Sequence, residues 1–120
     1  MQKDDKKQMK KNKPIFKYNN PLGISTDVVF VVRTYSNNGN LCVMLEDAET
    51  GEFFTDVTKN FEALSEGQAH IKNVDENEGM VQFLIDNDMG FLMGNWIEHY
   101  PLFFFHPVKL AEADSGGFAV

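Results

Sequence analysis

Short runs of alternating or continuous apolar residues cover most of the chain, which is typical of β-strands. The β-branched and aromatic run Asp27–Tyr35 predicts the clearest strand, and Leu41–Glu46 predicts its partner. Asn38-Gly39 between them is the strongest short hairpin signal, because both positions tolerate a positive φ. A second tight turn over 47–51 leads into a third strand, Glu52–Thr58. The first half of the chain therefore predicts a three-stranded meander.

Helical spacing of apolar residues occurs in one later segment, which follows a short predicted strand at 69–73. Its apolar positions fall on one face of a helix: Met80, Val81, Leu84 and Ile85. Asp75 fits the N-cap, and Glu78 three residues on completes the spacing of a capping box. Gly90 lies just past the end, where a left-handed cap residue is favoured. The pattern predicts one main helix over residues 76–87.

Aromatic, strand-like composition returns after this helix. Further strands are expected there at 91–93, 96–100 and 102–106, and one short strand is expected before the meander at 15–18. Pro101 and Pro107 interrupt the region after the helix, which favours edge strands for all three of its segments. The order of elements shows no βαβ alternation, so it predicts an α+β fold. That fold is an antiparallel sheet, with a three-stranded meander plus later edge strands, packed with one main helix.

The 120 residues are expected to form one domain, over residues 14–110. Residues 1–13 lack apolar periodicity and predict a disordered, lysine-rich arm, and residues 111–120 predict a flexible tail. No apolar run approaches the roughly 18 residues that a membrane span needs, and no apolar segment of a secretory signal follows the first residues. A cytoplasmic location without membrane contact is therefore expected.

Charge is distributed unevenly along the chain. Residues 1–17 hold seven lysines and two acids, a balance of +5, whereas residues 18–120 hold four basic residues and sixteen acids, a balance of −12. Like charge repels phosphate, so the acidic body argues against nucleic acid on the folded surface. Weak contact of the lysine-rich arm with nucleic acid or with an acidic partner stays open beside the interpretation of a solubilising leader.

Residues that carry chemistry do not form a recognisable motif. Cys42 lies in an apolar run and predicts a small buried side chain, and the serines occupy turns without a nucleophile elbow. His70, His99 and His106 show no metal-ligand spacing. Asp56 has no acid, base or histidine in its own segment, so a solvated strand face is expected there. The sequence predicts no enzyme, no metal site and no cofactor.

Three blocks of sequence, in order along the chain, resemble an uncharacterised family of small bacterial domains of unknown function. The blocks are LCVMLEDAETGEFFTDVTKNF, AHIKNVDENEGMVQFLIDNDMG and YPLFFFHPVKLAE, and the resemblance covers roughly residues 24–112. Two departures are the Trp96–His99 segment, where relatives carry a Ser-Gly step, and Lys59, where they carry an apolar or small residue. The family is found on plasmids, phages and conjugative elements of Firmicutes. The resemblance implies a bacterial cytoplasm and an accessory role, and it brings no site residues.

Three functions follow as hypotheses. The leading one is a non-enzymatic accessory or interaction protein of a bacterial mobile element, with an unidentified protein partner. An acidic DNA mimic that inhibits a nuclease is the alternative, and a small hydrolytic or metal enzyme is the second alternative. The predicted partner-contact surface is acidic: Glu46, Asp47, Glu49, Glu52, Asp75, Glu76 and Glu78. The run Phe103–Phe105 predicts either core packing or an exposed patch, and an edge strand there could pair across a homodimer axis.

Overall fold

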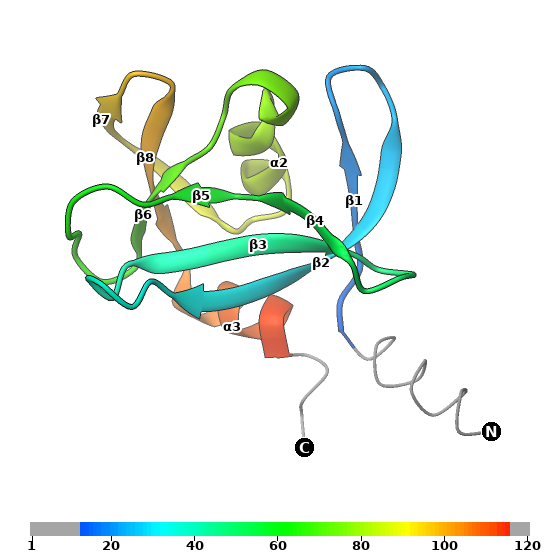
Figure 1. Ribbon diagram of the computed structural model, residues 1–120, viewed down its shortest axis with the longest axis horizontal. Helices are drawn as coiled ribbons and strands as arrows, with labels where there is room; N and C mark the ends of the chain where they lie inside the picture. The colour runs from blue at the N-terminus through cyan, green and yellow to red at the C-terminus, as the bar shows by residue number, and fades with distance from the viewer. Residues whose placement is uncertain (1–12, 116–120) are drawn as a thin grey trace.

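A computed structural model describes residues 13–115 of the chain. The predicted tail beyond 115 lies outside these residues, as does the predicted arm except for Lys13, whose Nζ donates to the carbonyl oxygen of Phe30 at 3.1 Å. The elements in order are β1 (Phe16–Asn19), β2 (Ser25–Thr34), β3 (Leu41–Asp47), β4 (Phe53–Asp56), β5 (Thr58–Lys59), β6 (Gln68–Ile71), the 3₁₀ turn η1 (Asp75–Asn77), α2 (Met80–Asp86), β7 (Gly90–Ile97), β8 (Tyr100–Phe105) and α3 (Pro107–Ser115) (Figure 1).

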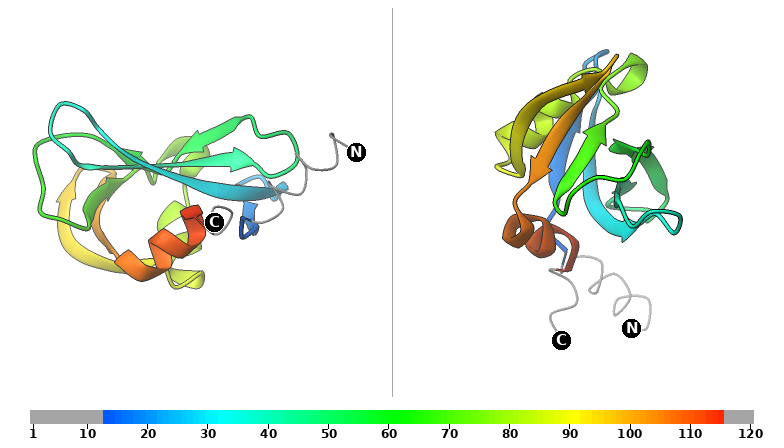
Figure 2. Two further views of the ribbon diagram at one scale, coloured as in Figure 1. Left: turned by 90° about the horizontal axis from the view of Figure 1, so that it is seen from below. Right: turned by 90° about the vertical axis from the view of Figure 1, so that its left-hand side faces the viewer.

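The strands form two antiparallel sheets of four strands, in the orders β1-β2-β3-β4 and β5-β6-β8-β7. The mixed α and β character and the antiparallel pairing agree with the prediction, whereas the single sheet with one main helix is wrong. Figure 2 shows the two sheets as separate layers. α2 lies beside β7 of the second sheet, and α3 packs against β2 of the first sheet. The predicted meander corresponds to β2, β3 and β4, which pair in the predicted order, and its first hairpin pairs Thr34 with Leu41.

The predicted third strand, Glu52–Thr58, divides between the two sheets at Val57. Val57 is fully buried, its N–H donates to the carbonyl oxygen of Val43 at 2.9 Å, and its own carbonyl accepts from the N–H of Lys72 at 2.8 Å. One residue therefore holds a strand of each sheet. This is where the chain leaves the first sheet for the second, and no local pattern in the sequence marks it.

The core lies between the two sheets and α2. Its buried side chains include Tyr18, Val28, Phe30, Val43 and Leu45 from the first sheet, Ala69, Ile71, Phe103 and Phe105 from the second, Met80, Phe83 and Leu84 from α2, and Leu110 and Ala113 from α3. The rings of Tyr18 and Phe83 meet edge to face at 5.1 Å. Phe103 and Phe105 thus belong to the core, whereas Phe104 points to the other face of β8 and is half-buried.

The predicted helix over 76–87 and its capping box at Asp75 are wrong at the N-terminal end. Asp75 itself has a positive φ of 56° and begins the 3₁₀ turn, and Gly79 in the left-handed conformation, φ 97°, separates that turn from α2. Buried Asn77 is held by hydrogen bonds to β4, which fixes the turn against the first sheet. These tertiary contacts outweigh the local helical pattern.

The predicted cap at Gly90 is also wrong. Asp88 takes the left-handed position, with φ 58°, and the N–H groups of Asp88 and Met89 donate to the carbonyls of Ile85 and Leu84 at 3.0 and 2.9 Å. This pair of hydrogen bonds is the Schellman arrangement that ends helices. Leu84 and Met89 are fully buried, which adds the apolar contact that usually accompanies it. Gly90 is then free to begin β7.

The C-terminal third differs from the prediction in two further ways. The strand at 102–106 corresponds to β8, which lies between β6 and β7 and is not an edge. Pro101 is tolerated because the β6 ladder ends at the pair His70–Leu102, so its missing N–H breaks no hydrogen bond there. Residues 111–115, predicted as tail, complete α3, where Ala113 is buried and Asp114 Oδ1 accepts from the N–H of Val32 at 3.0 Å.

Candidate functional site

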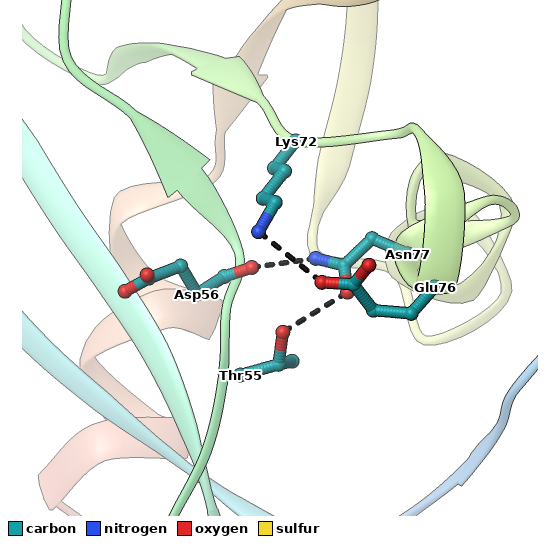
Figure 3. Close-up of polar contacts among 5 residues, drawn as sticks. All are labelled: Thr55, Asp56, Lys72, Glu76 and Asn77. Atoms are coloured by element: carbon teal, nitrogen blue, oxygen red, sulfur yellow. Dashed lines mark hydrogen bonds and ion pairs between the residues drawn. The ribbon is translucent and has the colours of Figure 1, made fainter.

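A polar pocket of about 290 Å³ lies between the ends of the first sheet and η1. Its lining comes from β1, β4, β6–η1 and η1: Tyr18, Asn20, Phe53, Phe54, Thr55, Asp56, Lys72, Glu76 and Asn77. Asn77 Nδ2 donates to the carbonyl oxygen of Asp56 at 2.7 Å, and Thr55 Oγ1 donates to Asn77 Oδ1 at 2.9 Å (Figure 3). The Asn77 amide therefore occupies the free edge of β4 and joins η1 to the first sheet.

Lys72 and Glu76 form an ion pair at 3.3 Å at the rim of this pocket. A hydrogen bond from its own backbone N–H, and then the Lys72 ammonium, hold the pKa of the Glu76 carboxyl below its usual value. Glu76 is fully exposed, so water screens this pair and it adds little to stability.

Asp56 lies on β4 where the sequence placed it, but the strand is not regular. Leu45 pairs with Thr55 and Glu46 pairs with Phe53, so β4 carries one extra residue, a β-bulge at Phe54. The bulge overturns the predicted alternation, since Phe53 is exposed while Thr55 is buried. Asp56 is half-buried, its side chain points away from Asn77 (Figure 3), and its carboxylate makes no hydrogen bond or ion pair among residues 13–115. The Asp56 carboxylate therefore lies on a half-buried face, where the sequence predicts a solvated one.

The predicted acidic surface divides into two groups. Glu46, Asp47, Glu49 and Glu52 surround the β3–β4 turn, where Asp47 Oδ1 accepts from the N–H groups of Glu49 and Thr50 at 2.8 and 3.0 Å. Asp75, Glu76 and Glu78 surround η1, and of these Glu76 lines the polar pocket together with Phe53. β4 lies between the two groups, and no hydrogen bond between side chains of these seven residues occurs in the described part of the chain.

An asparagine network, which the sequence interpretation missed, ties the β2–β3 hairpin to the segment after β5. Asn40 is buried, and its Nδ2 donates to Asn60 Oδ1 and to the carbonyl oxygen of Glu62, both at 2.9 Å. Asn40 Oδ1 accepts from the N–H of Leu64 at 2.9 Å, and Asn38 Nδ2 donates to Asn60 Oδ1 at 3.2 Å. The signal was present as recurring asparagines in the hairpin and after β5. The network fixes the 60–66 segment against the first sheet.

An apolar groove of about 640 Å³ begins at the end of that segment. It is lined mostly by apolar side chains, with two acids: Val32, Leu41, Glu66, Gly67, Phe104, Phe105, Pro107, Leu110, Ala111 and Asp114. One wall is α3, which the sequence interpretation treated partly as tail. Pro107 at the first helical position and the spacing from Leu110 to Ala113 are the signals that could have identified this helix.

Aromatic side chains continue the groove onto the outer face of the second sheet. Phe104, at the groove, packs against Phe91 of β7 with ring centroids 5.3 Å apart, and His106 lies 6.0 Å from Phe91. Gly67 is required beneath Phe104, because a Cβ there would lie 2.6 Å from the Phe104 ring and φ is +85°. The half-exposed Phe104 therefore belongs to a surface and not to the core.

The histidines and the cysteine occupy separate places. His70 is buried with Nδ1 2.8 Å from the carbonyl oxygen of Tyr100, whereas His99 and His106 are exposed. Cys42, expected to be buried, is half-buried next to Tyr35. No three His, Cys, Asp or Glu side chains between residues 13 and 115 lie close enough together to hold a metal ion.

Tyr18 is the one residue of the polar pocket with an unsatisfied buried group. Its side chain is 2% exposed, and its hydroxyl is the only buried side-chain polar atom in the described residues without a hydrogen-bond partner. Burial raises the pKa of this hydroxyl, and the Glu76 carboxylate raises it further. An unpaired buried hydroxyl costs about 1–3 kcal/mol.

Replacing Tyr18 by phenylalanine is therefore expected to leave stability unchanged or to raise it by about 1 kcal/mol in urea unfolding at neutral pH. The pKa of the Tyr18 hydroxyl is higher in the folded state than in the unfolded state, so the folded state favours the neutral hydroxyl. The free energy of unfolding is therefore unaffected by its ionisation below pH 10 and falls as pH rises through the folded-state pKa. Tyr18→Phe should accordingly lose less stability above pH 10 than the wild type. A fall of more than about 1 kcal/mol at neutral pH would mean that the hydroxyl has a partner.

Comparison with protein-family models, with curated proteins and with solved structures found no match to this chain. Among the described residues, no helix is long and apolar enough to cross a membrane.

Proposed function

We propose that the protein is a non-enzymatic accessory protein that acts by binding another protein, with the apolar groove beside α3 as the binding site. The single observation that carries this proposal is the groove itself. It is concave, it is built from β2, β3, β8 and α3, and most of its lining is apolar. Concave apolar surfaces with a few polar groups at the rim are the usual form of binding sites.

The charge of the groove favours a basic partner. Glu66 and Asp114 are the two charged residues of the lining, and the body of the chain from 18 to 120 carries −12. Asp114 already accepts a hydrogen bond from β2, so Glu66 is the carboxylate with most capacity for a ligand. A segment with an apolar face and flanking Lys or Arg residues would fill the groove and meet this potential.

The accessory role on a bacterial mobile element, in the cytoplasm, forms part of the same proposal. It is supported by the resemblance of the three sequence blocks to the Firmicutes family. A partner encoded near the gene is then expected to carry the basic, apolar-faced segment.

The proposal is tested with two synthetic amphipathic peptides of one pattern, a leucine–lysine peptide and its leucine–glutamate counterpart. The basic peptide is expected to bind and to shift the NMR signals of groove residues such as Leu41 and Leu110, and the acidic peptide is expected not to bind. Ala111→Arg should weaken binding of the basic peptide at least about tenfold, which corresponds to 1.4 kcal/mol. Ala111 is exposed, so the fold should tolerate the change.

Val108→Arg is the matched control, since Val108 lies on the same helix, is 68% exposed and does not line the groove. It adds the same charge and should leave binding within about twofold. Equal weakening by both variants would show attraction by charge alone and would contradict the groove. The same result would favour the DNA-mimic alternative, which is supported by the predicted acidic positions, since only Glu76 among them forms an ion pair within the described residues.

In that alternative, binding of a basic probe should depend on the acidic turn and not on the groove. Glu49→Gln combined with Glu52→Gln, both exposed residues beside the β3–β4 turn, should then weaken binding by more than Ala111→Arg does. The salt dependence should also be steep.

A further inference from the structure

The two sheets have four edge strands, and three of them carry a protective feature. β1 bears Lys17, which is exposed and pairs with Asp27 at 3.3 Å. β4 contains the bulge, and its edge is occupied by the Asn77 amide. β5 has only two residues, one of which is Lys59. Short length, lysine, bulges and side chains that cover the edge are the devices that keep sheet edges from pairing with other chains.

The fourth edge strand, β7, is longer and apolar. It spans eight residues and, among residues 13–115, pairs only with β8. Phe91, Leu92 and Met93 are consecutive and are 48, 39 and 39% exposed, so both faces of the strand present apolar side chains. No charged residue and no proline occurs from Met89 to Ile97. The irregularity after Leu92, with Gly94 at φ 100°, limits the regular part of the edge to its first residues.

The backbone groups that face outward from β7 follow from its pairing with β8. His106 N–H donates to the carbonyl oxygen of Met89 at 2.9 Å, one step before the register pair Gly90–Phe105. Residues in an antiparallel pair alternate between bonding across the ladder and facing away from it. Gly90 and Leu92 therefore direct their N–H and carbonyl groups to the free edge, and Leu92 lies between the exposed residues Phe91 and Met93.

We propose that two copies of the chain associate through β7, paired antiparallel about a two-fold axis at Leu92. Each Leu92 then exchanges N–H···O bonds with Leu92 of the second copy, and the two sheets join into one. Phe91 faces Met93 of the second copy across this axis, and methionine sulfur packs favourably against aromatic rings.

The charge of the chain favours a second copy as the occupant. The body carries −12, so two copies repel one another over most of their surface. Met89–Ile97 is a stretch of nine uncharged residues, where two copies can approach without that repulsion. A basic partner gains nothing from this strand in particular, because its attraction lies with the acidic surface elsewhere. The joined edge is self-complementary, as a two-fold interface must be.

Sedimentation equilibrium of the full chain over a range of concentrations tests the proposal. The wild type is expected to approach twice the monomer mass, and Leu92→Lys is expected to stay a monomer, since it places like charges opposite each other at the axis. Amide hydrogen exchange of Leu92 should slow as the wild-type concentration rises, while the melting temperature of the Leu92→Lys monomer shows whether its fold is retained. If that variant unfolds, Met93→Lys, at the strand irregularity, is the substitute.

Val108→Lys supplies the matched control, because Val108 is a more exposed apolar residue on α3 and away from β7. It should dimerise as the wild type does. The proposal is overturned if the wild type stays monomeric up to millimolar concentration, if Leu92→Lys still forms dimers, or if the wild type forms open-ended assemblies in place of a closed dimer.

Discussion

Replacing Gly90 by alanine is expected to lower the free energy of unfolding by about 3–5 kcal/mol, a large part of the 5–15 kcal/mol available to a domain. A Cβ at this position would lie 1.9 Å from the backbone oxygen of Phe104 and 2.8 Å from the ring of Phe103. Neither group can move freely, because β8 is held by strands on both sides and Phe103 is fully buried. The added methyl must separate β7 from β8.

Urea unfolding of Gly90→Ala beside Gly23→Ala measures this effect. Gly23 has φ 86° and nothing within 4 Å of its Cβ position, so alanine there meets backbone strain alone, at about 1–2 kcal/mol. At Gly90, by contrast, the cost of alanine comes from the steric clash of its Cβ with β8. A cost at Gly90 no larger than that at Gly23 would contradict the close approach of the two strands. If Gly90→Ala does not accumulate as folded protein, the extent of proteolysis during expression ranks the two variants, and Gly90→Ala should be degraded more than Gly23→Ala.

Replacing the buried Asn40 by alanine is expected to cost about 2–4 kcal/mol, because it removes three hydrogen bonds of a buried side chain. The Glu62 carbonyl loses its donor, Asn40 Nδ2, and the Leu64 N–H loses its acceptor, Asn40 Oδ1, both at 2.9 Å. Since the 60–66 segment ends at Glu66 and Gly67 of the groove, a looser segment should also weaken binding of the basic peptide.

The two consequences are measured separately, by urea unfolding and by hydrogen exchange of the Leu64 amide. Asn37→Ala removes an exposed hydrogen bond of the same network, from Asn60 Nδ2 at 3.0 Å, and should cost no more than about 0.5–1 kcal/mol. Faster exchange at Leu64 in Asn40→Ala, with exchange unchanged in Asn37→Ala, is the expected pattern. Equal behaviour of the two variants would mean that the Asn40 amide does not fix this segment.

The strands of the first sheet could be predicted because their signals are local. The run of β-branched residues around Val28–Val32 and the Asn38-Gly39 turn determine the hairpin without help from distant residues. The 3₁₀ turn at Asp75 could not be predicted in this way. Its acids and the apolar spacing after it satisfy the rules for a helix start. The competing hydrogen bonds come from β4, whose residues lie 21 and 22 positions before Asn77.

The candidate site shows the same limit. Acidic residues were predicted as the contact surface, since charge can be counted in a sequence. The groove could not be predicted because only folding brings its walls together. Leu41 lies in the first sheet and Phe104 in the second, and both line the groove. The third wall, α3, is held by the burial of Leu110 and Ala113. The segments at 91–93, 96–100 and 102–106 are all predicted as edge strands, and β7 is an edge of its sheet whereas β8 lies inside it. That difference follows from the strand order and not from composition.

Val57 links the behaviour of the two sheets in solution. Its N–H belongs to one ladder and its carbonyl to the other, and the side chain is fully buried between them. Neither sheet can open at this point without breaking a hydrogen bond of its neighbour and exposing the shared core. The chain should therefore melt in one cooperative transition, with fluorescence and circular dichroism giving the same midpoint, and a partner that clamps either sheet should raise the melting temperature of both.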